Sequence, residues 1–165
     1  MEPPFDTFTW PAARTFGDHG LIVDPDPAAG PLRVMLKSFG HLHEPIYTGR
    51  TAAADHRHLV LDVRALFADP YLKPEMREMT GRDDAVRANV LAQPGAVAYV
   101  IAHAEAIAAT VAPAKPGLVD ASVGCAGGRH RSVVIAEALS LVLAHGYGIA
   151  AEIHHRDIHR PVVRR

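Results

Sequence analysis

The stretch that decides the fold reads Ser122-Val123-Gly124-Cys125-Ala126-Gly127-Gly128-Arg129-His130-Arg131-Ser132. An apolar run, Leu118 to Val123, precedes the glycines, and a longer one, Val133 to Leu143, follows them. This order is typical of a buried strand that turns tightly into a helix. We therefore expect an α/β fold: a single domain with a mostly parallel sheet flanked by helices, and a ligand at the carboxyl ends of the strands.

The glycine-rich loop has the composition of an anion site. Its backbone N–H groups and the positive end of the following helix would face one point in space. Gly127 and Gly128 permit a positive φ and a close approach of backbone to ligand. Arg129 and Arg131 carry fork-shaped donors that match phosphate or carboxylate. We predict a bound anion, although the glycines could also serve a tight turn whose arginines are solvated.

Each predicted site residue has an expected role. Arg131 clamps the anion, His130 donates to it, and Cys125 lines the base of the loop. Asp62 and Arg64 end a buried strand at the edge where such sheets bind ligands, although they could equally form a structural ion pair. The full set of expected ligand-binding residues is Cys125, Gly127, Gly128, Arg129, His130, Arg131, Ser132, Asp62, Arg64 and His155.

The loop also fits the pattern C-x5-R-[ST], in which it resembles the phosphate loop of cysteine-dependent phosphatases. That resemblance implies a thiolate at Cys125 that attacks phosphorus and a clamp at Arg131. A general acid on another loop is also required, and Asp62 and Asp157 are the candidates. Phosphatase-like catalysis is therefore the alternative to a binding module without catalysis.

Several stretches along the chain carry a second, longer resemblance. They are Ser38–Gly40, Asp62–Arg64, Asp69–Tyr71, Thr80–Asp83, Gly124–Val133, Ile135–Glu137 and His155–Ile158. They read S-F-G, D-V-R, D-P-Y, T-G-x-D, G-C-x-G-G-x-H-R-S-V, I-A-E and H-R-D-I. In sequence and order they resemble the C-terminal domain of the RapZ (RNase adapter) family, over roughly residues 33–160.

The RapZ resemblance implies a fold similar to a phosphofructokinase subdomain, sensing of glucosamine-6-phosphate, small-RNA binding and a homo-oligomer. Full-length members carry a P-loop domain ahead of this module, whereas this chain contains no G-x-x-x-x-G-K-[ST]. It therefore resembles the C-terminal module standing alone, and nucleotide binding by a Walker loop is not carried over. We expect a phosphometabolite-sensing regulatory module without a cofactor.

RNA binding in that family uses basic residues near the chain end. The counterparts here are Arg156, Arg160, Arg164 and Arg165. Such a patch would contact phosphates in a salt-dependent way rather than read bases. A solvated tail explains the same residues, so both interpretations stay open.

Composition sets wider limits. The chain has 165 residues, a net charge of −1 and 48% apolar residues, which predicts one domain with a buried core and no global field for nucleic acid or membrane. The single cysteine is typical of a reducing cytosol. We see neither a secretory leader nor an apolar run of roughly 20 residues, so we expect a cytoplasmic protein. The histidines show no diagnostic metal spacing, and we expect no metal site.

The chain divides into three parts. Residues 1–31 hold six of the 13 prolines, which predicts an irregular arm, either disordered or packed through its aromatic residues. Residues 32–159 form the domain, and residues 160–165 form a basic tail. We expect strands at Leu32–Phe39, Leu59–Val63, Leu118–Val123 and Ile149–Ile153, and helices at Asp83–Leu91, Gly95–Ala112 and Arg131–His145. Asp83 is expected to cap the first helix.

Overall fold

The computed structural model describes residues 15–17, 20–22, 34–44, 57–111 and 119–164. Its centre is a four-stranded sheet in which every neighbouring pair of strands is parallel. The strand order is β4-β5-β3-β6. The strands are β3 (Val34–Gly40), β4 (Arg57–Asp62), β5 (Val119–Cys125) and β6 (Ala151–His155). The expected α/β class and parallel sheet are confirmed.

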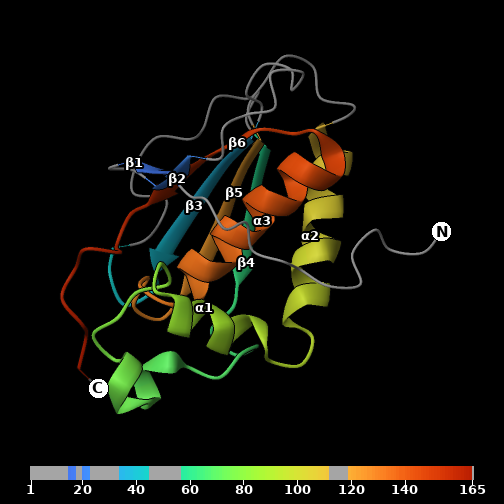
Figure 1. Ribbon diagram of the computed structural model, residues 1–165. Helices are drawn as coiled ribbons and strands as arrows, with labels where there is room; N and C mark the ends of the chain where they lie inside the picture. The colour runs from blue at the N-terminus through green and yellow to red at the C-terminus, as the bar shows by residue number, and fades with distance from the viewer. Residues whose placement is uncertain (1–14, 18–19, 23–33, 45–56, 112–118, 165) are drawn as a thin grey trace.

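Helices supply the crossovers that parallel strands require. The chain passes from β4 to β5 through α1 (Asp84–Leu91) and α2 (Ala96–Val111), and from β5 to β6 through α3 (Arg131–Tyr147). Figure 1 shows α3 lying across the sheet with α2 beside it. Two short 3₁₀ turns, η1 (Pro70–Leu72) and η2 (Pro74–Met76), lie between β4 and α1.

The third helix is the central one. All its residues from 131 to 143 are buried, as a helix that is apolar nearly all round predicts. It ends where Gly148 takes the left-handed conformation, with φ of 63°, and returns its N–H to the last turn. The side chains of Ile135, Leu139 and Leu143 are fully buried against the sheet and α2. The core therefore surrounds the helix that starts at the glycine-rich loop.

The register of the sheet assembles one functional edge. Gly40 of β3 lies opposite Cys125 of β5, and Asp62 of β4 lies opposite Gly124. The backbone pairing continues past the strands, because His41 N–H donates to the carbonyl of Cys125 at 2.8 Å. All four strands end on this side, and α3 begins there. The predicted site residues from distant segments therefore meet at the carboxyl edge of the sheet.

Two details differ from the sequence expectations. The expected irregular arm contains a short antiparallel hairpin, β1 (Thr15–Gly17) with β2 (Gly20–Ile22); the rest of residues 1–31 lies outside the described residues. The prediction that the Asp83 side chain caps α1 is wrong, because it makes no hydrogen bond to the first turn of the helix. Its Oδ2 accepts from the backbone N–H of Thr80 at 2.7 Å and from the Thr80 hydroxyl at 3.0 Å, so it closes the preceding turn rather than capping α1.

Within the described ranges, no single helix is long and apolar enough to cross a membrane. The bent pair α1 and α2 reaches that length and composition only when both helices are taken together, across a bend of 86°. Both helices bury their apolar side chains in the domain core, among them Val86, Val90, Val100 and Ile107.

Candidate functional site

The glycine-rich loop is shaped by a backbone contact that only glycine permits. Gly128 has φ of +74°, in the left-handed region that favours glycine. A Cβ at Gly128 would lie 2.6 Å from the backbone nitrogen of Gly40, and a Cβ at Gly40 would lie 2.5 Å from the carbonyl carbon of Gly127. The loop therefore rests directly on the end of β3. Gly127, by contrast, would find nothing within 4 Å of an added Cβ.

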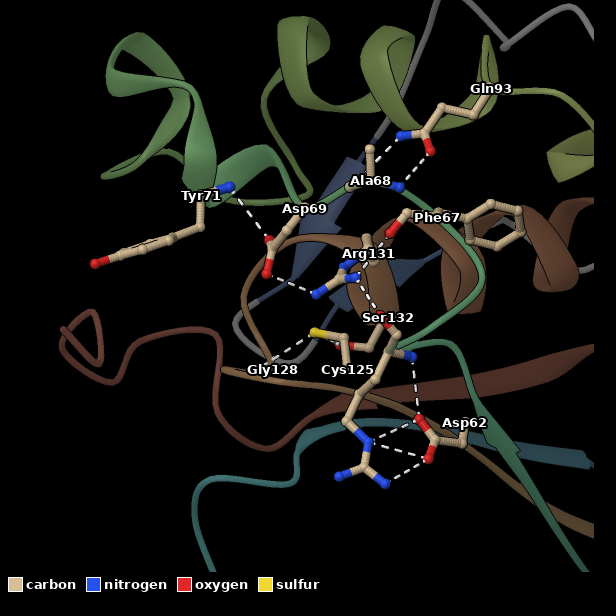
Figure 2. Close-up of polar contacts among 11 residues, drawn as sticks. Asp62, Phe67, Ala68, Asp69, Tyr71, Gln93, Cys125, Gly128, Arg131 and Ser132 are labelled. Carbon is tan, nitrogen blue, oxygen red and sulfur yellow. Dashed lines mark hydrogen bonds and ion pairs between the residues drawn. The ribbon is translucent and has the colours of Figure 1, made fainter. Parts of the chain in front are cut away.

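The thiol of Cys125 is buried inside this turn, with 2% of the residue exposed. Its Sγ accepts a hydrogen bond from Gly128 N–H at 3.2 Å and lies 3.1 Å from the Ser132 hydroxyl. These two contacts close the turn between β5 and the first residues of α3 (Figure 2). Cys125 therefore forms the base of the loop, where the sequence places it.

Arg131 points away from the loop's centre and toward the β4–α1 connection. Its Nη1 donates to the carbonyls of Arg64 and Phe67, both at 2.8 Å, and its Nη2 donates to Asp69 Oδ2 at 2.7 Å. Only 3% of the residue is exposed. Figure 2 shows this guanidinium between Asp69 and Phe67. Its Nε is also buried and has no hydrogen-bond partner among the described residues.

The segment that accepts hydrogen bonds from Arg131, residues 64–69, is itself held by Gln93 at the α1–α2 junction. Gln93 Oε1 accepts the backbone N–H of Ala68 at 2.6 Å, and Gln93 Nε2 donates to the Ala68 carbonyl at 3.2 Å. Asp69 Oδ1 accepts from Tyr71 N–H at 3.2 Å, which leaves its other oxygen for Arg131. Arg131 thus joins the loop to the segment after β4, and Gln93 joins that segment to the α1–α2 junction.

Arg129 and His130 are also engaged by main-chain carbonyls. Arg129 Nη1 donates to the carbonyls of Ile158 and Arg160, at 3.2 and 2.6 Å, and its Nη2 donates to that of Glu78 at 2.8 Å. His130 Nε2 donates to the carbonyl of Met79 at 2.8 Å. Burial lowers the pKa of His130 below its ordinary value, so the ring favours its neutral form.

Two cavities adjoin this network. The smaller, of about 20 Å³, is lined by Asp69, Tyr71, Cys125, Gly127, Arg129, His130, Arg131, Val162 and Val163. The larger is an open cleft of about 430 Å³ lined by His41, Leu42, Arg64, Phe67, Asp69, Ala126 and Arg131. Asp69 and Arg131, which form an ion pair, line both of them. The structure therefore brings most of the predicted site residues to one place.

The outer wall of the cleft carries the exposed pair that ends β4. Arg64 donates to both carboxylate oxygens of Asp62, with its Nη2 2.6 Å from Oδ2. The hydrogen bonds from Arg64 lower the pKa of Asp62 to about 2, and the carboxylate raises the pKa of Arg64. About half of the Arg64 side chain is exposed. It is the arginine of the cleft that can still turn toward a ligand.

His41 stands beside this pair, and its ring stacks at a tilt on Phe39 with centroids 4.7 Å apart. Its Nε2 is buried and lies 3.6 Å from Asp62 Oδ1. Burial and the charge of Arg64 lower the pKa of His41. Gly124 is needed here, because a Cβ would lie 2.5 Å from both rings' nearest atoms.

His155 lies deeper than the cavities, which it does not line. Its Nδ1 is 2.7 Å from the Ser38 hydroxyl, and its Nε2 is 3.4 Å from Glu137 Oε1, a carboxylate that is fully buried in α3. Arg82 Nε lies 3.6 Å from the same oxygen. His154 faces the other side of β6 and is exposed, as strand alternation predicts.

The predicted basic patch is largely paired with acids. Arg156 donates to Asp157 Oδ2 at 2.7 Å, and the same oxygen accepts Gly40 N–H at 2.8 Å. Arg160 lies 2.8 Å from Glu44 and 3.0 Å from Asp157. Arg164 is exposed. Arg165 lies outside the described residues.

Asp69 and Glu137 are the residues that sequence reasoning missed. Both stand in the quoted motifs, D-P-Y and I-A-E, and that position was the available signal. Among the residues with a described structure, no group of three or more His, Cys, Asp or Glu side chains is placed to hold a metal ion.

Comparison with known proteins identifies the family. Residues 32–159 match the family profile of the RapZ C-terminal domain. The chain belongs to the RapZ C-terminal domain family.

Relatives include a "Nucleotide-binding protein" of Clavibacter michiganensis subsp. michiganensis, 39% identical over 132 residues, which are 78% of this chain and 42% of the relative. One of the same name from Salinispora tropica is 42% identical over 132 residues, 78% of this chain and 40% of the relative. A third, from Acidothermus cellulolyticus, is 40% identical over 145 residues, 83% of this chain and 42% of the relative. The chain thus spans about two fifths of the length of these RapZ-family relatives.

Proposed function

We propose that this RapZ-type domain is a non-catalytic regulatory module that binds a small phosphorylated metabolite at the carboxyl edge of its sheet. The observation that carries the proposal is the convergence of the glycine-shaped loop, the start of α3 and the cleft between them. A helix start and a glycine-rich loop favour an anion. The cleft, at about 430 Å³, is large enough for a sugar-sized ligand.

In this proposal two arginines have different roles. Arg131 holds the scaffold through two carbonyls and Asp69, and its buried Nε has no hydrogen-bond partner among the described residues. Arg64 is exposed at the mouth of the cleft, so it is the donor that would bind the ligand's charge directly. Gly127 supplies a backbone donor, whereas the N–H of Gly128 already donates to Cys125 Sγ. Asp62 holds Arg64 in place until the ligand competes for it.

A thermal-unfolding screen tests the proposal on the whole chain. The panel contains inorganic phosphate, sulfate, citrate, hexose 6-phosphates, glucosamine-6-phosphate and a nucleotide. A ligand at 100 times its Kd should add about 2.7 kcal/mol of stability. We expect a phosphosugar to raise the midpoint in the wild type and to lose most of its effect in Arg64→Ala. Lys73→Ala removes an exposed cation outside the cleft and should behave like the wild type. No shift with any anion contradicts the proposal.

The module would pass its state to a partner, and RNA is the partner implied by the RapZ resemblance. Arg156 and Arg160 are engaged with Asp157 and Glu44, so a polyanion would compete with these carboxylates. Deleting residues 160–165 should reduce the salt dependence of RNA affinity. An unchanged slope would leave a protein partner instead. A homo-oligomer would double this surface, which sedimentation can test.

Phosphatase-like catalysis is the second candidate, favoured by the contacts of Cys125. Its Sγ accepts a hydrogen bond from Gly128 N–H and adjoins the Ser132 hydroxyl, at the base of the loop that fits C-x5-R-[ST]. The geometry of Arg131 counts against it, because both terminal nitrogens are bound to the protein. Turnover of p-nitrophenyl phosphate that disappears in Cys125→Ser, while anion binding persists, would establish catalysis. Absence of turnover leaves the binding module.

A further inference from the structure

The segment Pro161–Arg164 lies over the glycine-rich loop. Val162 and Val163, both half-buried, line the smaller cavity together with Cys125 and Arg131. The segment follows β6 and reaches the loop from the far side of the sheet's edge. Two apolar side chains thus cover a site whose remaining wall carries buried nitrogen donors.

The cavity under these valines is too small for the ligand class that the loop fits. At about 20 Å³ it holds about one water molecule. A phosphate group has five heavy atoms and cannot enter while the valines are in place. The buried Nε atoms of Arg129 and Arg131 have no hydrogen-bond partner in the described part of the chain. The cavity is therefore lined by two arginines with unpartnered buried nitrogens, but it has no room for a phosphate group.

Among the described residues, hydrogen bonds hold the covering segment at its beginning, beside Arg160. Arg129 of the loop donates to the carbonyls of Ile158 and Arg160, and Arg160 N–H donates to the carbonyl of Asp157 at 3.1 Å. In the described residues, the hydrogen bonds that fix the segment stop at Arg160. Pro161 follows at once and restricts the backbone there. The valines beyond it are half-buried and lie outside the main core cluster, so lifting them would break none of the loop's described hydrogen bonds.

We infer that Pro161–Arg164 is a lid on the anion loop, closed by Val162 and Val163 and lifted when a phosphorylated ligand enters. The inference rests on the proposed anion site, of which the smaller cavity at the glycine-rich loop is the part next to the valines, and it adds the regulation of that part. Lifting the lid also moves Arg164, so occupancy of the site changes the basic surface offered to a partner. The closed population reduces the apparent affinity for the ligand in proportion to the open fraction.

Alkylation of Cys125 reads the lid without any ligand, since it is the chain's only cysteine and lies in the covered cavity. We expect the double variant Val162→Ser/Val163→Ser to raise the rate of reaction with iodoacetamide by about tenfold. Leu72→Ser, at a residue 73% exposed, is the matched surface control and should leave the rate unchanged. Ile107→Val, in the core of α2, measures how much global loosening alone contributes. A rate equal to the wild type, or no higher than that of Ile107→Val, overturns the lid.

Affinity for inorganic phosphate and for a hexose 6-phosphate, measured by calorimetry on the same variants, separates the two proposals. The lid predicts that the double variant binds about tenfold more tightly than the wild type. Equal or weaker binding shows that the valines do not oppose the ligand and overturns the lid while the anion site stands. If neither chain binds an anion but alkylation accelerates, the proposed function fails and the lid remains a gate on the thiol.

Discussion

Arginines play opposite parts in two regions of the sheet's carboxyl edge: the inner half, which is the glycine-rich loop, and the outer half, which is the Asp62–Arg64 pair after β4. In the inner half, Arg129 and Arg131 are tied to main-chain carbonyls, and Arg131 is almost completely buried. In the outer half, Arg64 is half exposed, and its side chain is paired with Asp62, which is also exposed. Arginines that look alike in sequence therefore divide into scaffold and contact. The difference teaches that the charge in an anion motif can hold the loop rather than the anion.

The largest expected effect on stability comes from removing an arginine of the inner half. Arg131→Ala leaves the carboxylate of Asp69 without its 2.7 Å partner and frees two carbonyls. Removing one member of a buried pair lowers the free energy of unfolding by about 3–5 kcal/mol. Urea denaturation measures the loss. A change below about 1 kcal/mol, within the range of ordinary surface substitutions, would mean that Arg131 is no scaffold.

A pair of neighbouring glycines provides the next test. Gly128→Ala places a Cβ in the left-handed region and 2.6 Å from Gly40 N, so the free energy of unfolding should fall by about 2–5 kcal/mol. Gly127→Ala meets open space and should change it by less than about 0.5 kcal/mol. Equal losses at both positions would show that the loop does not rest on β3 as described.

The pH dependence of stability tests the burial of the inner half. The pKa of His130 is lowered in the folded state, whereas in the unfolded chain it returns to about 6.5. Below 6.5 the unfolded chain binds more protons, so stability is fully present above 6.5 and is lost as the pH falls through the folded-state pKa. The melting midpoint should fall between about pH 7 and pH 5, and less steeply in His130→Gln. The exposed His154→Gln should keep the wild-type slope, and equal slopes in all three proteins would contradict a buried neutral His130.

The smallest effect on stability belongs to the outer half. Arg64→Ala should change the free energy of unfolding by less than about 0.5 kcal/mol at neutral pH, because both partners are exposed. The pKa of Asp62 should rise from about 2 toward 3.8. Stability from this pair is present above 3.8 and lost as the pH falls toward 2. An NMR titration of Asp62 checks the shift, and an unmoved pKa would show that Arg64 is not its cause.

The elements of the fold follow from sequence because their signals are local. Apolar runs mark β4 and β5, and Gly148 marks the end of α3. The loop at residues 125–131 was equally predictable, since glycines between an apolar strand and an apolar helix indicate a tight turn. These features depend on neighbours in the chain.

The direction of each arginine was not predictable from sequence. The partners of Arg131 lie 62 to 67 residues earlier in the chain, at positions that only the folded sheet brings together. The same reason hid Asp69, which reads as part of a turn until α3 is docked beside it. The pairing of Arg160 with Glu44 was hidden too, because it joins residues 116 apart. The sequence shows which charged side chains are present, but only the folded topology shows which of them are paired with one another and which stay exposed.

The contact between Gly40 and Gly128 also has a consequence for the order in which the molecule forms. The two backbones touch only after β3 has paired with β5 and α3 has seated, so the contact joins segments that are remote in the chain. Closing such a distance is a late step for a folding chain. The loop's final shape is therefore completed with the last stage of folding. Substitutions at either glycine should therefore act on the assembled domain rather than on the loop alone.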